Sequence, residues 1–540
     1  MTSLTPTSRW LAVALLAASV GAAAQSAPAA GAAISATPTA IQSFKVSGNS
    51  LVDSARLQAV LARYLGPRNN QELRTAALAL QALYREAGYG AVLVSVFQPG
   101  PDGVAEVRVL EGKMALISVI GTQQFSAESV RRAVPSLQED KTPRIAEINR
   151  QVELANQNPA RKLAVTLEPG QKVGAVDARV IVTEGPVLRP QFALDNTGTK
   201  QTGRTRISAG LRHADVGGRG HQASVNWQTS VEEPSRVSIL SLNYMAPLPE
   251  SARRIDLYAV RSNVDGGSTP TAAGALQFNG RGNVLGAQLT QLLLRQGEWD
   301  QRLRAGIDQR EYRNRCTIEG LPEGACGAPG ESVTVQPLTL DYSIQGGRSV
   351  MFGANVGLSH NLGLGGRYAK AANFEAVREG ARYRYTALRL GGHLQQGGGK
   401  QASLTARMSL QWTRDALVPG EQFGLAGANA VRGYREREIT GDRGLLASVE
   451  WSPAPWALAS RPDAQLRGLL FADWGKVWNE TGGECRQGQA SCDLHAVGLG
   501  LRYSDGPWRL HMDLARAGRA GTLTESGDVR LHLSASYGLD

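Results

Sequence analysis

Residues 529–537 read Val529-Arg530-Leu531-His532-Leu533-Ser534-Ala535-Ser536-Tyr537, so apolar and polar side chains alternate along the stretch. A period of two is typical of a β-strand with one apolar and one polar face. The same alternation recurs from residue 188 to the end of the chain, in short runs that end at Gly, Asn, Asp or Pro. Clear examples are 207–211, 223–227, 255–259 and 510–514. These residues therefore predict an all-β structure with almost no helix.

Alternation alone does not separate a soluble β-sandwich from a transmembrane β-barrel. Three features favour the barrel: an export signal with no later spanning helix, runs near the nine to eleven residues of a tilted membrane strand, and a last run that ends at the C-terminus. At about 22 residues per strand and connection, the segment accommodates about 16 strands, an even number that closes the sheet. We therefore expect residues 187–540 to form a 16-stranded antiparallel transmembrane barrel, surrounded by outer-membrane lipid.

The N-terminus has the three parts of a secretory signal peptide. Arg9 precedes an apolar run over 10–20, and small residues follow up to Ala24, after which we expect cleavage. The apolar run is shorter than the about 20 residues of a spanning helix. Residues 25–41 are rich in Ala, Pro and Ser and predict a linker without an amphipathic helix. The mature chain is therefore expected to be exported.

The net charge of +11, from 58 basic and 47 acidic residues, is spread along the chain. No block of five or six Lys or Arg occurs, which disfavours a nucleic-acid partner. The arginines mostly stand singly between apolar residues, as at Arg206, Arg212, Arg467, Arg502 and Arg530. In a barrel, such side chains would line a polar lumen.

The four cysteines form two local pairs, Cys316 with Cys326 and Cys485 with Cys492, in polar, Gly-rich stretches. We expect two disulfides, which fits an oxidising compartment. Metal binding is the alternative, but neither pair has the two-residue gap or the neighbouring His that is typical of zinc sites.

The sequence lacks the common catalytic motifs. It has no Gly-x-Ser-x-Gly, no His-Glu-x-x-His and no nucleotide-binding loop. His495, His511 and His532 are most simply residues of barrel strands. We therefore expect a protein that is not an enzyme and has neither cofactor nor metal.

Residues 42–186 contain an internal repeat. The tripeptide that ends at Gly48 recurs as the one that ends at Gly121, and 107–112 recurs as 180–185, both at an offset of 73 residues. Each copy predicts the order β-α-α-β-β, with the last two strands joined at a Pro-Gly. Such a small sheet, covered by helices on one side, leaves an edge strand that can pair with an extended polypeptide. A purely architectural role for the repeats is the alternative.

Two motifs stand out in the β-rich part. Val431-Arg432-Gly433-Tyr434, continued to Gly441-Asp442, lies on a long loop between strands, where charged residues are usually solvated surface. The second motif, 471–475, lies in a strand whose alternation puts Phe471 and Asp473 on one face, followed by Gly475. Because a carboxylate toward lipid is costly, Asp473 should face the lumen.

Together these features resemble the outer-membrane superfamily that couples periplasmic POTRA modules to a 16-stranded barrel. Within it, the chain is similar to the two-partner secretion transporters of the ShlB/FhaC/HecB family. Nearly the whole mature chain takes part, including Asn158-Pro159 and Pro169-Gly170 of the second repeat. The resemblance implies POTRA 1 at 42–113, POTRA 2 at 114–186, and a sixth extracellular loop near 422–444 that folds into the lumen.

The resemblance also implies a function. Arg432 of the loop would meet Asp473 of the wall in a charge-assisted contact. The POTRA modules would recognise a partner exoprotein in the periplasm, a TpsA-like adhesin, haemolysin or contact toxin, and the barrel would secrete it to the cell surface. The barrel-assembly machinery would read the last strand, where Tyr537 is the aromatic candidate. An assembly or insertion factor of the same superfamily is the alternative.

Overall fold

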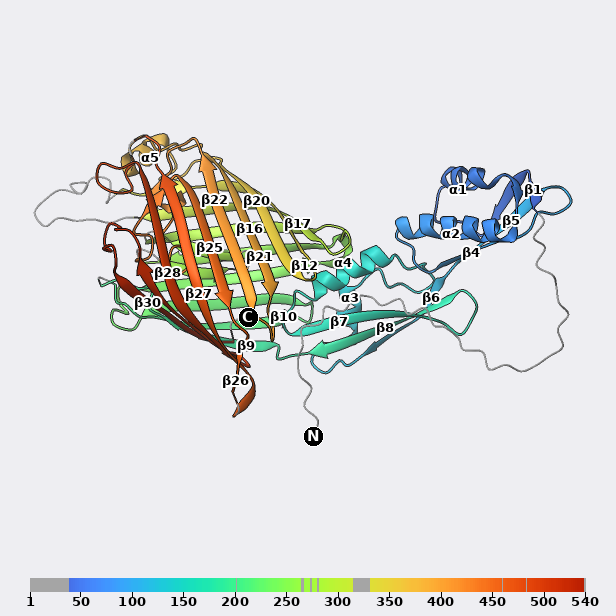
Figure 1. The fold of residues 1–540 in the computed structure, drawn as a ribbon, viewed down its shortest axis with the longest axis horizontal. Coiled ribbons are helices and arrows are strands. Elements are labelled where there is room, and N and C mark those ends of the chain that lie inside the picture. The colour runs from blue at the N-terminus through green and yellow to red at the C-terminus, as the bar shows by residue number, and fades with distance from the viewer. Residues whose placement is uncertain are drawn as a thin grey trace, which may run out of the picture. The chain divides into compact units, whose positions relative to one another are not determined.

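The computed structural model describes residues 38–538, except 201, 264–266, 272–273, 279–280, 314–330, 459 and 482. The expected signal peptide and the Cys316–Cys326 pair lie outside the described residues. The chain divides into two compact units, Met1–Gly185 and Pro186–Asp540, which Figure 1 colours from blue to cyan and from green to red. None of the helices described is long and apolar enough to cross a membrane.

The first repeat is a three-stranded sheet with helices on one face. Its elements are β2 (Ser43–Ser47), α1 (Ser54–Leu61), the 3-10 helix η1 (Ala62–Tyr64), β3 (Gly66–Arg68), α2 (Asn70–Glu86), β4 (Val92–Val96) and β5 (Val104–Glu111). The sheet order is β2-β5-β4, with β2 parallel to β5. Helix α2 begins at a capping box of Asn69 and Glu72, and its buried face, including Leu73 and Leu80, packs into the core.

The first described strand lies inside the segment predicted as a linker. Strand β1 (Thr39–Ile41) pairs with β3 in a separate two-stranded sheet. Ile41 is buried in the core of the first repeat, which holds this strand in place. An Ala- and Pro-rich composition did not reveal this strand because it is only three residues long.

The second repeat has the same β-α-α-β-β order, without counterparts of η1 and β3 in its described residues. It consists of β6 (Lys113–Ile120), α3 (Ala127–Ala133), α4 (Ile145–Ala155), β7 (Arg161–Pro169) and β8 (Ala175–Glu184), with the sheet order β6-β8-β7. Pro169 ends β7, and the N–H of Gly170 donates to the carbonyl of Ala175, which closes the turn into β8 (2.9 Å).

The repeated glycines occupy equivalent positions that another residue would strain. Gly48 and Gly121 have φ of +81° and +88°, a region that other residues rarely adopt. A Cβ at these positions would lie 2.1 Å from the carbonyl oxygen of Val109 and 2.3 Å from that of Val182. Both glycines are therefore needed where the first strand of each repeat ends against the last.

A repeated carboxylate ties together the same parts of each repeat. Glu111 accepts hydrogen bonds from the N–H groups of Ser50 (2.6 Å) and Leu51 (3.0 Å). Glu184, 73 residues later, accepts from three consecutive N–H groups at 123–125 (3.1, 2.6 and 3.1 Å). In both copies, the end of the last strand thus fixes the loop that follows the first.

The second unit is a closed antiparallel barrel of 16 strands (Figure 1). In chain order these are β9 (Leu188–Asp195), β10 (Arg206–Val216), β11 (His221–Ser230), β12 (Ser238–Leu248), β13 (Arg253–Ser262), β16 (Arg281–Leu292), β17 (Asp300–Arg313), β19 (Pro337–Gly346), β20 (Val350–Asn361), β21 (Thr386–Gly397), β22 (Ser403–Thr413), β25 (Arg443–Ser452), β27 (Arg461–Trp478), β28 (Ser491–Asp505), β29 (Trp508–Ala517) and β30 (Val529–Tyr537). Pairing of β30 with β9 closes the ring. The predicted fold class, repeats followed by a 16-stranded barrel, is confirmed.

Smaller elements extend the barrel or lie in its connections. The short strands β18 (Val333–Val335) and β26 (Trp456–Leu458) pair with barrel strands, while β14 (Gly267–Thr271) with β15 (Gly274–Phe278) and β23 (Phe423–Gly424) with β24 (Thr440–Gly441) form two-stranded sheets. The connections also contain the 3-10 helices η2 (Pro249–Ser251) and η4 (Pro419–Glu421) and the helix α5 (Ala371–Val377).

The alternation along each strand separates a lipid-facing side from a lumen-facing side. On β27, Leu470 and Trp474 are exposed on the outside, whereas Phe471 and Asp473 are buried inside. On β30, Tyr537 lies against the rings of Phe192 and Trp508, with ring centres 6.3 and 5.0 Å away. Large apolar side chains exposed in this way suit contact with lipid tails.

The lumen is less uniformly polar than its arginines suggested. Two apolar clusters contain residues of the connection between β22 and β25. One contains Tyr312, Val333, Val335, Phe374, Val377, Ala381, Tyr385, Leu417 and Val418. The other contains Leu425, Ala426, Val431, Tyr434, Ile439, Leu446, Val477, Cys485, Cys492, Leu494, Ala496 and Ala517. This connection is thus packed inside the barrel like part of a protein core.

Candidate functional site

Loop 6, which we define as residues 414–442, joins β22 to β25. The structure starts it eight residues before the predicted range of 422–444 and places Arg443 and Gly444 in β25. The strand ends early because Leu417 and Val418 turn inward and are buried in the first apolar cluster. Alternation alone could not reveal this, since apolar residues also continue a strand.

The structure brings Arg432 and Asp473 together inside the barrel. The guanidinium Nε and Nη2 donate to the two carboxylate oxygens at 2.7 and 2.8 Å, and the N–H of Arg432 adds a third bond of 3.1 Å. Both residues are almost fully buried, at 1% and 2% exposed. The guanidinium also lies 3.4 Å above the ring of Phe471. A planar guanidinium matches a carboxylate in this two-bond geometry, which a lysine would not reproduce.

Arg432 belongs to a larger network that the sequence alone did not reveal. Glu450 accepts from its Nη1 at 2.7 Å, and Asp513 lies 3.5 Å from the same nitrogen. Asp513 in turn accepts two bonds from Arg502 (2.7 and 2.9 Å), and Arg407 lies 3.9 Å from Glu450.

The network contains three arginines and three carboxylates and is therefore electrically balanced. The five wall residues come from the adjacent strands β22, β25, β27, β28 and β29, one from each. Burying a charge is costly unless an opposite charge lies beside it. The burial of Arg432 therefore depends on wall side chains that are spread over 107 positions of the sequence, from Arg407 to Asp513. The alternation of apolar and polar residues predicts that Glu450 and Asp513 lie on the inner face of the barrel. It does not predict that they lie beside Arg432.

The rest of the loop motif also contacts the wall. Val431 is fully buried in the second apolar cluster. Gly433 has φ of +92°, and its N–H donates to Nε2 of His532 on β30 at 2.9 Å. The hydroxyl of Tyr434 lies 3.0 and 2.8 Å from the carbonyl oxygens of His495 and Arg519. His532, expected only as a wall residue, is therefore a contact of the loop tip.

Gly475, Gly441 and Asp442 contact other parts of loop 6 and its neighbours. A Cβ on Gly475 would lie 2.4 Å from Cδ1 of Leu425, and one on Gly441 would lie 2.7 Å from Cβ of Val477. Asp442 accepts from Arg378 Nη2 at 2.7 Å and from the N–H groups at 417 and 480 at 2.9 and 2.8 Å. The predicted motif thus combines a tip, at 431–434, with an anchored end, at 441–442.

The Cys485–Cys492 disulfide is formed in the connection between β27 and β28. Both cysteines are buried in the second apolar cluster, beside Val431 and Tyr434 of loop 6. The disulfide therefore closes a neighbouring loop that packs directly against the loop tip.

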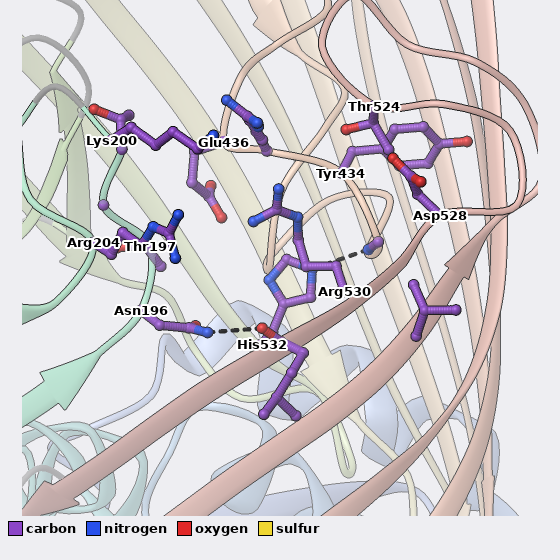
Figure 2. A pocket seen from close by; sticks show the side chains of 16 residues that line it. Asn196, Thr197, Lys200, Arg204, Tyr434, Glu436, Thr524, Asp528, Arg530 and His532 are labelled. Atoms are coloured by element: carbon purple, nitrogen blue, oxygen red, sulfur yellow. Dashed lines mark hydrogen bonds between the residues drawn. The ribbon is translucent and has the colours of Figure 1, made fainter.

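A cavity of about 480 Å³ lies beside the tip of loop 6. Figure 2 shows it between Tyr434 and Glu436 of the loop, the side chains of Arg530 and His532, and the connection after β9 that carries Lys200. Residues of both signs line it, so it is a polar space inside the barrel and carries no recognisable catalytic grouping.

In the second repeat, Asn158-Pro159 forms the turn between α4 and β7. The side chain of Asn158 is buried and accepts from the N–H of Ala160 at 2.9 Å. Arg161, which the sequence did not single out, is buried with its guanidinium 5.1 Å from the ring of Phe125 and bonded to Ser129. These residues shape the turn and the first residue of β7.

The free edges of the two small sheets differ. The N–H of Phe97 donates to the carbonyl of Glu106 at 2.9 Å, and the N–H of Gly112 donates to the carbonyl of Ala91 at 2.8 Å. The main-chain groups of the odd-numbered residues 91–97 therefore point toward β5. By alternation, the main-chain groups of 92, 94 and 96 point to the open edge, because β4 is the last strand of its sheet and pairs with β5 alone among the described strands. On β7, the side chain of Asn156 bonds both the N–H and the carbonyl of Leu163 (2.6 and 3.0 Å). The β7 edge is thus partly closed, whereas the β4 edge is open.

A family model for the haemolysin secretion/activation protein ShlB/FhaC/HecB matches residues 175–503, and a model for the ShlB-type POTRA domain matches residues 39–112. The chain belongs to this family. It is therefore a two-partner secretion transporter of the outer membrane, with N-terminal POTRA modules that are periplasmic in the ShlB/FhaC/HecB family. The predicted family and location are confirmed.

Known ShlB/FhaC/HecB-type transporters are similar over most of the chain. The heme/hemopexin transporter protein HuxB of Haemophilus influenzae (strain 86-028NP) is 22% identical over 501 residues, which cover 87% of this chain and 81% of HuxB. The outer membrane transporter CdiB of Escherichia coli is 24% identical over 507 residues, covering 86% and 79%. The solved structure of CdiB from Escherichia coli has a TM-score of 0.76 at 16% identity, covering 95% of this chain and 92% of CdiB. These family members are transporters.

Proposed function

We propose that this transporter recognises a partner exoprotein through its POTRA modules and passes it through the barrel to the cell surface. The open edge of β4 is the observation that carries the recognition step. Main-chain groups at such an edge bind an extended polypeptide of almost any sequence. An unfolded exported protein presents such a segment, whereas a folded one does not.

Side chains beside the β4 edge would add selectivity. Leu93 and Phe97 alternate on the face away from the helices and are 62% and 43% exposed. Arg108 of the neighbouring strand lies 4.7 Å from the ring of Phe97 and is bonded to Glu106. An added strand would lay every second side chain over this surface, which favours a segment with alternating apolar residues.

Loop 6 supports the transport step. It occupies the lumen, and its tip is held by polar contacts that can re-form after they break. The cargo would be an adhesin, haemolysin or contact toxin, and the matching family model names haemolysin secretion. The periplasm supplies no nucleotide, so we propose that folding of the cargo outside the cell prevents its return.

Comparison of exported proteins with and without the transporter tests this function. In a strain that lacks the gene, we expect one large exoprotein to disappear from the medium and cell surface and to be found in the periplasm. Replacing Leu93 and Phe97 by serine should reduce its secretion, while Leu116→Ser, an equally exposed apolar change in the second repeat, should not. Unchanged exoprotein levels in the deletion strain would contradict the proposal.

An assembly factor of the same superfamily is the second candidate. BamA from Haemophilus ducreyi, in a solved structure that lacks POTRA domains 1-3, shares the fold with a TM-score of 0.50 at 12% identity. An assembly factor would lower the amounts of several unrelated outer-membrane proteins in the deletion strain. A secretion channel would leave those amounts unchanged.

A further inference from the structure

We propose that loop 6 has a second clamp at its root, centred on Glu421, and that this clamp keeps the loop in the lumen when the Arg432 contact at the tip is released. Glu421 and Arg310 are then positioning residues of the channel. The inference concerns the barrel alone and does not depend on which cargo is secreted.

Glu421 is as deeply buried as the ion pair at the tip. Its side chain is 0% exposed, and both carboxylate oxygens lie near Nη1 of Arg310, at 2.9 and 3.3 Å. The hydroxyl of Tyr312 donates to the same carboxylate at 3.0 Å. Arg389, from β21, lies 3.6 Å away. A carboxylate buried among two arginines and a tyrosine is paired rather than stranded.

The wall supports this clamp from behind. Nη2 of Arg310 also donates to Asp308 at 2.6 Å, so two carboxylates hold its guanidinium. Gln411 of β22 donates to the carbonyl oxygens of Glu421 and Asp442, at 3.1 and 3.0 Å, and thus joins the two ends of loop 6. The clamp therefore fixes both the start and the end of the loop.

Close packing surrounds the charged groups. A Cβ on Gly420 would lie 2.5 Å from the ring of Tyr312, so the main chain of the loop lies directly on that ring. Leu417 and Val418 are buried with Phe374 of α5 in the first apolar cluster. The root is thus docked by apolar packing as well as by ion pairs.

The two clamps use different parts of the wall. Arg310 and Tyr312 lie on β17, the seventh strand of the ring, whereas Asp473 and His532 lie on β27 and β30, the thirteenth and sixteenth. The contacts given above for Glu421 and for Arg432 have no residue in common. Each clamp can therefore break while the other stays formed, and a released tip remains tethered inside the barrel.

Conductance of the purified full-length protein in planar lipid bilayers tests the two clamps. The variants are Glu421→Gln, Arg432→Gln and the double variant, each checked for a closed barrel by heat-modifiable migration on a gel. Glu375→Gln is the matched control, because this exposed carboxylate of α5 bonds the nearby N–H of Gly380. Current without cargo is measured, so failed secretion does not affect the result.

We expect brief openings in each single variant, because the remaining clamp returns the loop to its place. The double variant should show a long-lived open level whose current exceeds the sum of the two single effects, and the control should match the wild type. The proposal is overturned if the double variant behaves like Arg432→Gln, since the root would then hold nothing. It is also overturned if either single variant opens the channel fully, since the loop would then detach as one unit.

Discussion

The POTRA repeats and loop 6 are both well packed, but they are held by different contacts. The first repeat buries an apolar core whose members recur at helix and strand spacing along one short segment. Loop 6 is held by buried ions whose partners come from strands far apart in the sequence. The comparison teaches that local periodicity specifies the repeats, whereas closure of the barrel creates the contacts of the loop.

Arg432→Ala should abolish most secretion while the barrel still inserts. Removal of one partner from a buried ion pair costs about 3–5 kcal/mol, and about 1.4 kcal/mol already corresponds to a tenfold change in an equilibrium. We therefore expect secretion to fall more than tenfold, measured as exoprotein in the medium. Arg435→Ala, three residues further along the loop, is the control. Normal secretion by the Arg432 variant would remove the tip contact from the mechanism.

Leu80→Ala should destabilise the periplasmic unit by about 2–5 kcal/mol, the usual cost of truncating a buried leucine. Leu80 is fully buried in the core of the first repeat, whereas Leu78 on the same helix is 58% exposed. Leu78→Ala is therefore the matched control and should change stability by less than about 0.5 kcal/mol. Urea unfolding of residues 38–185 measures both. Equal effects would show that the predicted helix face does not form the core.

Glu184→Gln and Glu111→Gln should each cost about 1–3 kcal/mol, because each carboxylate accepts bonds from consecutive main-chain N–H groups. Glu168→Gln removes an exposed ion pair with Arg179 and should cost less than about 1 kcal/mol. The free energy of unfolding in urea gives all three values. If only one of the repeated glutamates matters, the two repeats are not stabilised in the same way.

Asn69→Ala should have the smallest effect, a loss of about 1 kcal/mol. The side chain of Asn69 accepts from the N–H of Glu72 at 2.9 Å, and the Glu72 carboxylate accepts from the N–H of Asn69. This last bond lowers the pKa of Glu72 below its usual range. An unchanged urea midpoint would show that the capping box does not form in solution.

Much of the candidate site was already visible in the sequence. The position of Asp473 followed from alternation and from the cost of a carboxylate in lipid, and Arg432 came from the resemblance to the family. Glu421 was missed because a single glutamate in a Gly-rich loop has no periodic partner. Glu450 and Asp513 lay on predictable inner faces, but nothing in the sequence aligned them with Arg432. The Cys485–Cys492 disulfide was predicted from spacing, whereas its packing against the loop tip was not.

The sequence by itself determined two repeats with helices and strands in a fixed order, followed by a barrel with an apolar outer face. Periods of two and of about 3.6 residues record which side of each element meets water or lipid, and they need only neighbouring residues. The tertiary structure alone decided where loop 6 lies and which charges it meets. Those contacts depend on register around the whole ring, because a shift of one residue in any strand would turn its charged side chain toward lipid.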